Sequence, residues 1–116
     1  MKNILLIEDD ITMSNLLTML LKLEGFSSTS INPATEIIMD SIAKEDPECI
    51  IMDVHLKFAN GIEITKALKK KNNFRSRIIL TSGMDLEKEC LDAGADNFLL
   101  KPYMPEDLIR ILKSEV

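Results

Sequence analysis

The feature of this chain that most limits its fold is a set of short apolar runs that end in a polar side chain. The clearest run is Cys49-Ile50-Ile51-Met52, which leads directly into Asp53. Another, Asn3 to Ile7, leads into the acidic stretch Glu8-Asp9-Asp10. Because such a run has no polar face, it predicts a strand buried on both sides, as in a parallel sheet covered by helices.

Further strands and the helices between them follow from the same patterns. The remaining predicted strands are Phe26 to Ile31, which is rich in Ser and Thr and suits a sheet edge, Arg77 to Thr81, and Asp96 to Leu100. A helical spacing predicts a first helix with Met13, Leu16, Leu17 and Leu20 on its buried face, ended by a left-handed cap at Gly25. Later helices are predicted to start at Asn32-Pro33, with Ala34, Ile37, Ile38 and Ser41 buried, and to run from Gly61 to about Lys70, from Asp85 to Asp92, and from Pro105 through Leu108, Ile111 and Leu112.

The alternation of strands and helices predicts the architecture. It indicates an α/β fold with a parallel sheet and right-handed crossovers. For five strands the common solution is a flavodoxin-like doubly wound (βα)5 three-layer sandwich with strand order 2-1-3-4-5. In that order the first and third strands are neighbours, so Glu8 and Asp9 would meet Asp53 at the sheet edge where such folds bind ligands. The chain shows no repeat or linker, and residues 1–116 are predicted to form one domain.

The composition is that of an ordinary globular domain and disfavours some partners. Hydrophobic residues make up 46% of the chain and charged residues 28%. The net charge of -5 argues against direct nucleic-acid binding. No apolar stretch is long enough to span a membrane, and no signal peptide is recognisable. Cys49 and Cys90 lie in apolar contexts, so we predict reduced core thiols in a cytoplasmic protein.

The residues expected to carry chemistry all end predicted strands. They are Glu8, Asp9, Asp53, Thr81 and Lys101. Carboxylates brought this close repel one another unless some take up protons or a cation binds between them. Ligation by a few carboxylates and retained waters is typical of Mg²⁺, and we therefore predict a magnesium site. For the adjoining Asp10, a role as N-cap of the next helix is equally well supported.

Asp53 is the predicted nucleophile, because a carboxylate can attack phosphorus to give an aspartyl phosphate. Phosphoryl transfer requires mainly positioning and charge neutralisation. Mg²⁺ and the Lys101 ammonium would supply the charge, and Thr81 would donate a hydrogen bond. Taken singly, Lys101 is more often a surface lysine and Thr81 a hydroxyl bonded to the backbone. Their combination, each at the end of its own strand, favours a phosphoryl-transfer site.

Together these segments resemble the receiver (REC) domain of the two-component response-regulator family over the whole chain. The segments are Ile4 to Asp10, Ile51 to Asp53 with Gly61 eight residues later, Leu80-Thr81-Ser82, and Gly94 to Pro102. The resemblance implies a phosphorelay signal-transduction domain whose Asp53 accepts a phosphoryl group from a sensor histidine kinase or phosphotransfer protein. It implies Mg²⁺ bound by Asp9, Asp53 and the backbone carbonyl of His55, with Glu8 acting through water.

The resemblance also implies a conformational switch through Thr81 and Phe98. Phosphorylation adds about 1.5 to 2 negative charges at one point. If Thr81 and Lys101 move toward them, the fourth and fifth strands shift and the Phe98 ring turns inward. The alternative for Phe98 is a plain core aromatic.

The loop after Asp53 departs from the family pattern. Lys57 stands where the family usually has proline, so the loop is less restrained in φ, and Phe58 beside it is unusual. The His55 side chain either leans over the phosphoryl site and tunes water access, or is an exposed loop histidine without a role.

Other classes of function were weighed against the same residues. A phosphorylation-independent interaction module on this fold is the main alternative, and the intact strand-end set argues against it. A flavin-binding electron carrier would share the strand order, but the chain has no Trp, one Tyr, and no Ser/Thr/Gly-rich phosphate loop after the first strand. Dinucleotide and P-loop motifs are absent from the sequence. A receiver domain would catalyse only its own phosphorylation and dephosphorylation.

The cognate kinase and the output stay open at this point. The sequence fits a stand-alone receiver, and it equally fits part of a longer protein with an effector domain or a downstream protein partner. A phosphorylation-dependent homodimer through the face of the fourth and fifth strands and their helices is also left open by the resemblance.

Overall fold

A five-stranded parallel sheet forms the centre of the computed structural model, which describes residues 3–34 and 37–114. Its strands are β1 (Asn3–Ile7), β2 (Ser27–Ile31), β3 (Cys49–Asp53), β6 (Arg77–Ser82) and β7 (Asn97–Leu100). Their order is β2-β1-β3-β6-β7, which is the predicted 2-1-3-4-5 when only the strands of this sheet are counted. Two short strands that were not predicted, β4 (His55–Leu56) and β5 (Ala59–Asn60), form a separate antiparallel ribbon after β3.

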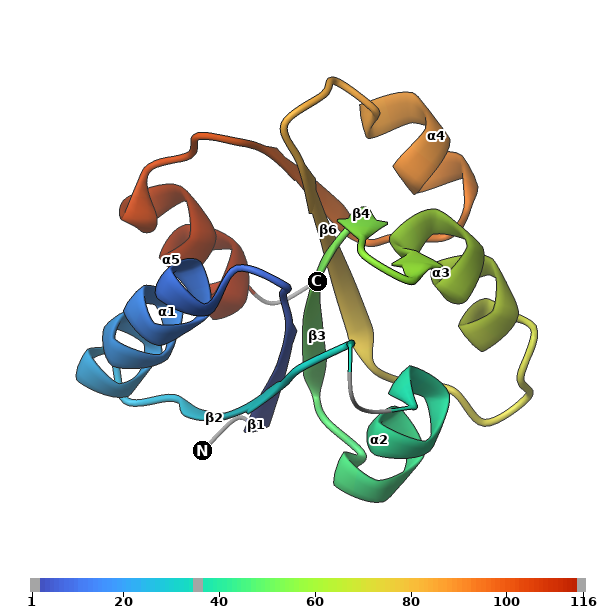
Figure 1. Ribbon diagram of the computed structural model, residues 1–116, viewed down its shortest axis with the longest axis horizontal. Helices are drawn as coiled ribbons and strands as arrows, with labels where there is room; N and C mark the ends of the chain where they lie inside the picture. Colours follow the sequence, from blue (N-terminus) through green and yellow to red (C-terminus); the bar gives the residue numbers. More distant parts are fainter. Residues whose placement is uncertain (1–2, 35–36, 115–116) are drawn as a thin grey trace.

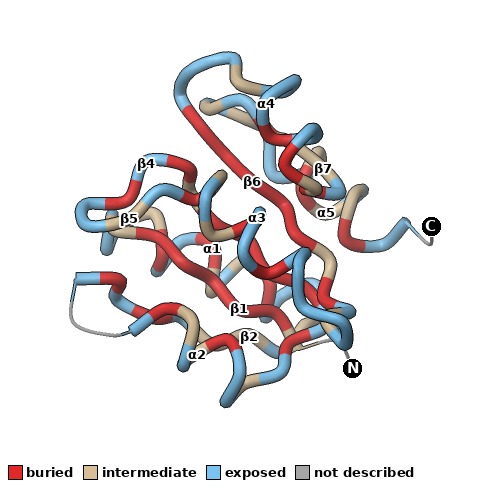
Figure 2. The backbone as a smooth tube through the Cα atoms, turned by 90° about the vertical axis from the view of Figure 1, so that its right-hand side faces the viewer, coloured by how far each residue is buried: buried red, intermediate tan, exposed pale blue. Residues whose placement is uncertain are grey.

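Helices cover both faces of the sheet. Figure 1 shows α1 (Ile11–Leu23) and α5 (Pro105–Lys113) on one face and α2 (Ile38–Glu45), α3 (Gly61–Lys69) and α4 (Glu87–Asp92) on the other. The residues of β1 alternate between the two cores, with Leu5 and Ile7 under α2, α3 and α4, and Ile4 and Leu6 under α1 and α5. Buried residues concentrate along the central strands, as Figure 2 shows. The central strands β1 and β3 are largely apolar because both of their faces are covered, whereas the edge strand β2 is mostly polar and only its last residue, Ile31, is buried. The predicted fold class is confirmed.

The first helix begins and ends as predicted, and Met13, Leu17 and Leu20 of its predicted buried face pack against the core, but Leu16 does not. Asp10 is its N-cap, and the carboxylate accepts a hydrogen bond at 3.1 Å from the backbone N–H three residues later. Gly25 follows the helix with a φ of +88°, as a left-handed cap requires. Leu21 is fully buried, whereas Leu16 is 57% exposed, so the placement of Leu16 on the buried face was wrong. The stripe that meets the sheet runs through Leu17 and Leu21 instead.

The second helix starts later than the sequence indicates. The side chain of Asn32 accepts a hydrogen bond from the backbone N–H of Ala34 at 2.9 Å, which makes a local turn. Helix α2 begins only at Ile38, and Ile37 before it is extended. The predicted burial of Ala34 and Ile37 is wrong, because both are exposed while Ile38 packs into the core. Residues 35–36 of the predicted helix lie outside the described part of the chain.

The remaining helices lie within two residues of their predicted bounds. Cys49 and Cys90 are both buried thiols, as expected. Burial, with the charge of Glu89, raises the pKa of Cys90 to about 11, so this thiol is protonated at neutral pH. Within residues 3–34 and 37–114, no helix has the length and apolar character needed to cross a bilayer.

Candidate functional site

Asp53 and Thr81 are neighbours at the carboxyl edge of the sheet. Strand β3 pairs with β6 in a register that sets Asp53 opposite Thr81. The backbone N–H of Val54 then donates to the carbonyl of Thr81 at 2.8 Å, which extends the pairing past the end of β3. Thr81 is only 3% exposed. Backbone pairing of two central strands therefore sets these two residues side by side at the edge of the sheet.

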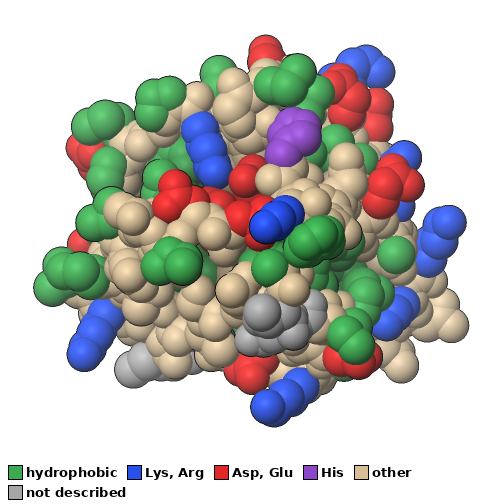
Figure 3. Space-filling view, in the orientation of Figure 1, with side chains coloured by type: hydrophobic (Ala, Val, Ile, Leu, Met, Phe, Trp, Pro, Cys, Tyr) green, Lys and Arg blue, Asp and Glu red, His purple; other side chains and the backbone are tan. Residues whose placement is uncertain are grey.

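The flanking strands β1 and β7 bring acidic and basic residues to the same edge. Strand β1 pairs with β3 along most of its length, so Glu8 and Asp9 leave β1 at the level of Asp53. Lys101 directly follows β7, and its backbone N–H donates to the carbonyl of Ser82 at 2.8 Å. Figure 3 shows acidic side chains gathered near the middle of one face of the molecule, with basic side chains beside them. The residues predicted from strand ends thus lie together in the structure.

The ammonium of Lys101 links two of the carboxylates. Its Nζ lies 3.0 Å from Oε1 of Glu8 and 3.4 Å from Oδ2 of Asp53. Burial alone would lower the pKa of Lys101, but the hydrogen bond and charge of Glu8, together with the charge of Asp53, raise the pKa above its ordinary value. The lysine is therefore an ammonium at any physiological pH. Because all three side chains are largely shielded from solvent, this attraction is stronger than in a surface pair.

The donor atoms at this edge also suit a hard divalent cation. Asp9 and Asp53 offer carboxylate oxygens, and the chain enters β4 at His55 just beyond Asp53. Glu8 is held by the lysine and accepts a hydrogen bond from the Asp10 N–H at 3.2 Å, which suits a role through water. In the part of the chain that the structure describes, no three His, Cys, Asp or Glu side chains form a group that could hold a metal. A carboxylate pair completed by a carbonyl and waters is a usual set of ligands for Mg²⁺, so the donors present fit this ion.

A tight loop carries the chain from β3 into α3. The N–H of Gly61 donates to the carbonyl of Val54 at 2.8 Å. A Cβ atom at Gly61 would lie 2.7 Å from the backbone oxygen of Asp53, so any larger residue would displace the backbone of the site. Asn60 caps α3 by accepting a hydrogen bond from the N–H of Ile62 at 2.8 Å. This explains why glycine occupies the start of the helix after Asp53.

Sequence reasoning missed two groups at the site. The backbone N–H of Lys57 donates a hydrogen bond to Oδ2 of Asp9. No side-chain pattern announces a backbone donor, although the lack of proline at this position permits one. The other group is Tyr103, where burial and then the charges of Glu8 and Asp53 raise the pKa to about 12. Its place two residues after Lys101 was the available signal.

Phe98 and His55 occupy positions that fit either interpretation given for them. Phe98 lies on β7 opposite Leu80, is half-buried, and packs against the core under α2, α3 and α4. His55 opens β4 and is exposed.

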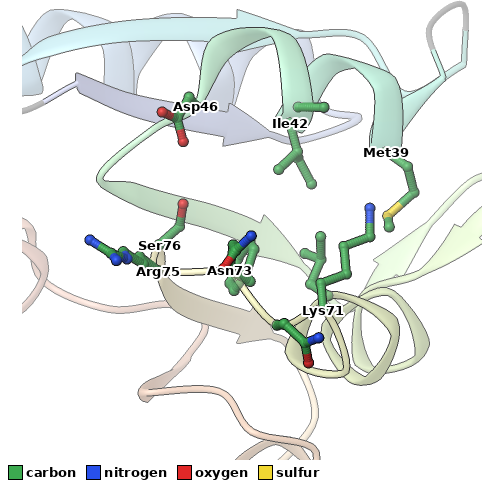
Figure 4. A pocket seen from close by; sticks show the side chains of 11 residues that line it. Met39, Ile42, Asp46, Lys71, Asn73, Arg75 and Ser76 are labelled. Atoms are coloured by element: carbon green, nitrogen blue, oxygen red, sulfur yellow. The ribbon is translucent and has the colours of Figure 1, made fainter.

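The surface has hollows both beside the strand-end residues and away from them. One of about 250 Å³ lies against α1 and the end of β2, and Glu8 and Asp9 are in its lining. Another, of about 340 Å³, opens between α2 and the loop from α3 to β6, where Met39 and Ile42 face Lys71 (Figure 4). None of the strand-end residues lines the second hollow.

Comparison with known proteins agrees with this geometry. The family model of the response regulator receiver domain matches residues 4–113. The transcriptional regulatory protein CpxR homolog of Haemophilus influenzae is 33% identical over 115 residues, which cover 98% of this chain and 50% of that protein. The DNA-binding response regulator MtrA of Mycobacterium tuberculosis is 26% identical over 117 residues, covering 99% of this chain and 50% of that protein. The chain spans about half the length of these relatives.

Solved structures share the fold. The receiver domain of the Francisella response regulator 1452 has a TM-score of 0.88 at 23% identity, covering 97% of this chain and 93% of that one. The receiver domain of a signal transduction histidine kinase from Syntrophus aciditrophicus has a TM-score of 0.86 at 25% identity, covering 97% of this chain and 88% of that one. With the family match over nearly all of its length, this chain belongs to the response-regulator receiver-domain family of two-component signal transduction.

Proposed function

We propose that Asp53 accepts a phosphoryl group from the phosphohistidine of a sensor histidine kinase or phosphotransfer protein. The observation that carries this proposal is the contact of one ammonium, that of Lys101, with the carboxylates of both Glu8 and Asp53. These side chains follow three different strands, and their convergence beside a buried threonine is what phosphoryl transfer to a carboxylate requires. We take residues 1–116 as one receiver domain.

In the proposed reaction a carboxylate oxygen of Asp53 bonds to phosphorus while the phosphorus–nitrogen bond of the phosphohistidine breaks. The electron pair of the broken bond returns to the imidazole. The Lys101 ammonium neutralises charge on the phosphoryl group, and the Thr81 hydroxyl donates a hydrogen bond to it. Attack of water on phosphorus later releases phosphate and regenerates the Asp53 carboxylate.

Asp9, Asp53 and the backbone carbonyl of His55 would hold Mg²⁺, with Glu8 acting through water. When bound, this ion would neutralise further charge on the phosphoryl oxygens.

The output of the proposed switch would travel through β6 and β7. Phosphorylation adds about 1.5 to 2 negative charges beside Thr81 and Lys101. Thr81 belongs to β6, and the N–H of Lys101 is bonded to Ser82 of the same strand, so a shift of either residue moves both strands. Phe98, which is half-buried on β7, would change its packing in response.

We further propose that this output reaches an effector domain or a downstream protein. Relatives named as transcriptional or DNA-binding regulators are about twice as long as the region they share with this chain. The net charge of -5 disfavours DNA binding by these residues themselves. We place the domain in the cytoplasm, where its buried thiols stay reduced. We also propose that a phosphorylation-dependent homodimer would use the face formed by α4, β6, β7 and α5.

The test is incubation with acetyl phosphate and Mg²⁺ followed by intact-mass measurement. We expect one phosphoryl adduct on the wild type and on Asp10→Asn, and none on Asp53→Asn. Asp10→Asn is a matched control because asparagine caps a helix as well as aspartate does. An equal adduct on Asp53→Asn would refute the assignment. A wild type inert to both acetyl phosphate and beryllofluoride would favour a phosphorylation-independent module.

A further inference from the structure

The backbone N–H of Lys57 donates a hydrogen bond to Oδ2 of Asp9, with 2.5 Å between the nitrogen and the oxygen. Lys57 and Phe58 form the tip of the β4–β5 ribbon, between the paired residues Leu56 and Ala59. The bond therefore ties the tip of this ribbon to the end of β1. Neither Lys57 at the ribbon tip nor this bond has a role in the function proposed above.

This hydrogen bond completes a pattern at the acidic edge. Glu8 and Asp53 are both in contact with the Lys101 ammonium, and Asp9 accepts the amide of Lys57. An amide N–H is the positive end of a dipole, so it offsets part of the charge of the carboxylate that accepts it. Each of the three carboxylates thus already has a donor from within the chain.

We propose that the Lys57 amide competes with a divalent cation for the Asp9 carboxylate, so that the ribbon tip weakens cation binding and is released when the cation binds. The proposal rests on the proposed function, in which Asp9 is a magnesium ligand. A lone pair that accepts the N–H is not available to the cation. The cation also meets the positive end of the amide dipole at the same ligand, so each partner of Asp9 disfavours the other.

Such competition makes the ribbon tip responsive to the cation. The side chain of Phe58 at the tip is 71% exposed, and Nζ of Lys57 lies 5.5 Å from the centre of its ring. Because coupling between two binding events is reciprocal, a protein that holds this tip away from Asp9 would tighten cation binding by the same factor.

The chain offers a matched pair of variants that isolates the amide. Proline has no backbone N–H, so Lys57→Pro removes the donor. Among the described non-glycine residues only Asp46 has a positive φ, so φ of Lys57 is negative, as it is in proline. Leu56 before it is a strand residue, and proline favours an extended residue at that place. Lys57→Ala is the control, because it removes the same ammonium and keeps the N–H.

Magnesium affinity is measured by isothermal titration calorimetry on both variants and the wild type. A hydrogen bond to a charged group is worth roughly tenfold or more in an equilibrium constant, and the exposure of the tip reduces this. We expect Lys57→Pro to bind Mg²⁺ about five- to tenfold more tightly than Lys57→Ala. Equal affinities, or weaker binding by the proline variant, would overturn the competition.

Asp9→Asn, titrated in parallel, separates this result from the proposed function. If the wild type binds no Mg²⁺, or Asp9→Asn binds it as tightly as the wild type, the proposed magnesium site itself fails. If Asp9→Asn loses binding while the two Lys57 variants bind equally, only the competition fails. If the proline variant does not fold, hydrogen exchange of the Lys57 amide in the isotope-labelled wild type tests the same point. We expect this amide to exchange faster with saturating Mg²⁺ than without it. Unchanged protection of the amide would contradict the proposal.

Discussion

The ionisation of Tyr103 gives a quantitative check on the electrostatics of the site. Burial, and then the charges of Glu8 and Asp53, raise the pKa of Tyr103 to about 12 in the folded chain. An unperturbed tyrosine has a pKa of about 10. Because the unfolded chain releases this proton first, the contribution of Tyr103 to the free energy of unfolding is intact below pH 10 and is lost as the pH rises toward 12. Two units correspond to about 3 kcal/mol in all, of which about half is lost at pH 11.

The assay is direct because the chain has one tyrosine and no tryptophan. Ultraviolet absorbance of tyrosinate therefore reports Tyr103 alone. We expect the native chain to titrate about two pH units above the urea-unfolded chain. Glu8→Gln should lower the pH midpoint of the native titration by part of that difference. The free energy of unfolding of Tyr103→Phe should fall less between pH 10 and 12 than that of the wild type. A native midpoint near pH 10, with the circular dichroism of a folded protein, would refute the reasoning.

Three further predictions concern stability, each measured by urea unfolding. Gly61→Ala should lower the free energy of unfolding by about 1 to 3 kcal/mol, because the new Cβ meets the backbone of the site; an unchanged midpoint contradicts the close approach. Ile38→Ala should cost about 2 to 4 kcal/mol and Ile37→Ala less than about 0.5, since only the first side chain is in the core; a reversed ranking would restore the earlier helix start. Arg77→Met removes hydrogen bonds to the end of α5 and should cost about 1 to 2 kcal/mol, whereas the exposed Arg75→Met should cost less than about 0.5; equal effects would show that this contact is not stabilising.

The strands and their order could be predicted because a strand that is buried on both faces appears in the sequence as a short continuous apolar run. A run as short as Ile4 to Ile7, flanked by polar residues, favours a strand over a helix, and short crossovers then restrict the order of the strands. The same logic located Asp53, Thr81 and Lys101 without knowledge of any contact, because parallel strands end at a common edge.

What could not be predicted depends on local competition. The Asn32-Pro33 pair favours a turn and a helix start about equally, and the choice was made by the burial of Ile38. Leu16 and Leu21 both fit a helical stripe, and only the direction in which α1 crosses the sheet decides between them. The amide of Lys57 was invisible because every residue except proline carries one.

Chemical mapping of the phosphorylated residue tests most directly whether the strand-end carboxylate is the acceptor. An acyl phosphate is reduced by borohydride to the alcohol, so a phosphorylated aspartate becomes homoserine and can be located by peptide mass spectrometry. After treatment with acetyl phosphate and Mg²⁺, we expect homoserine at Asp53 and unmodified aspartate at Asp9 and Asp10. Homoserine at either of those residues, with Asp53 intact, would contradict the site described here.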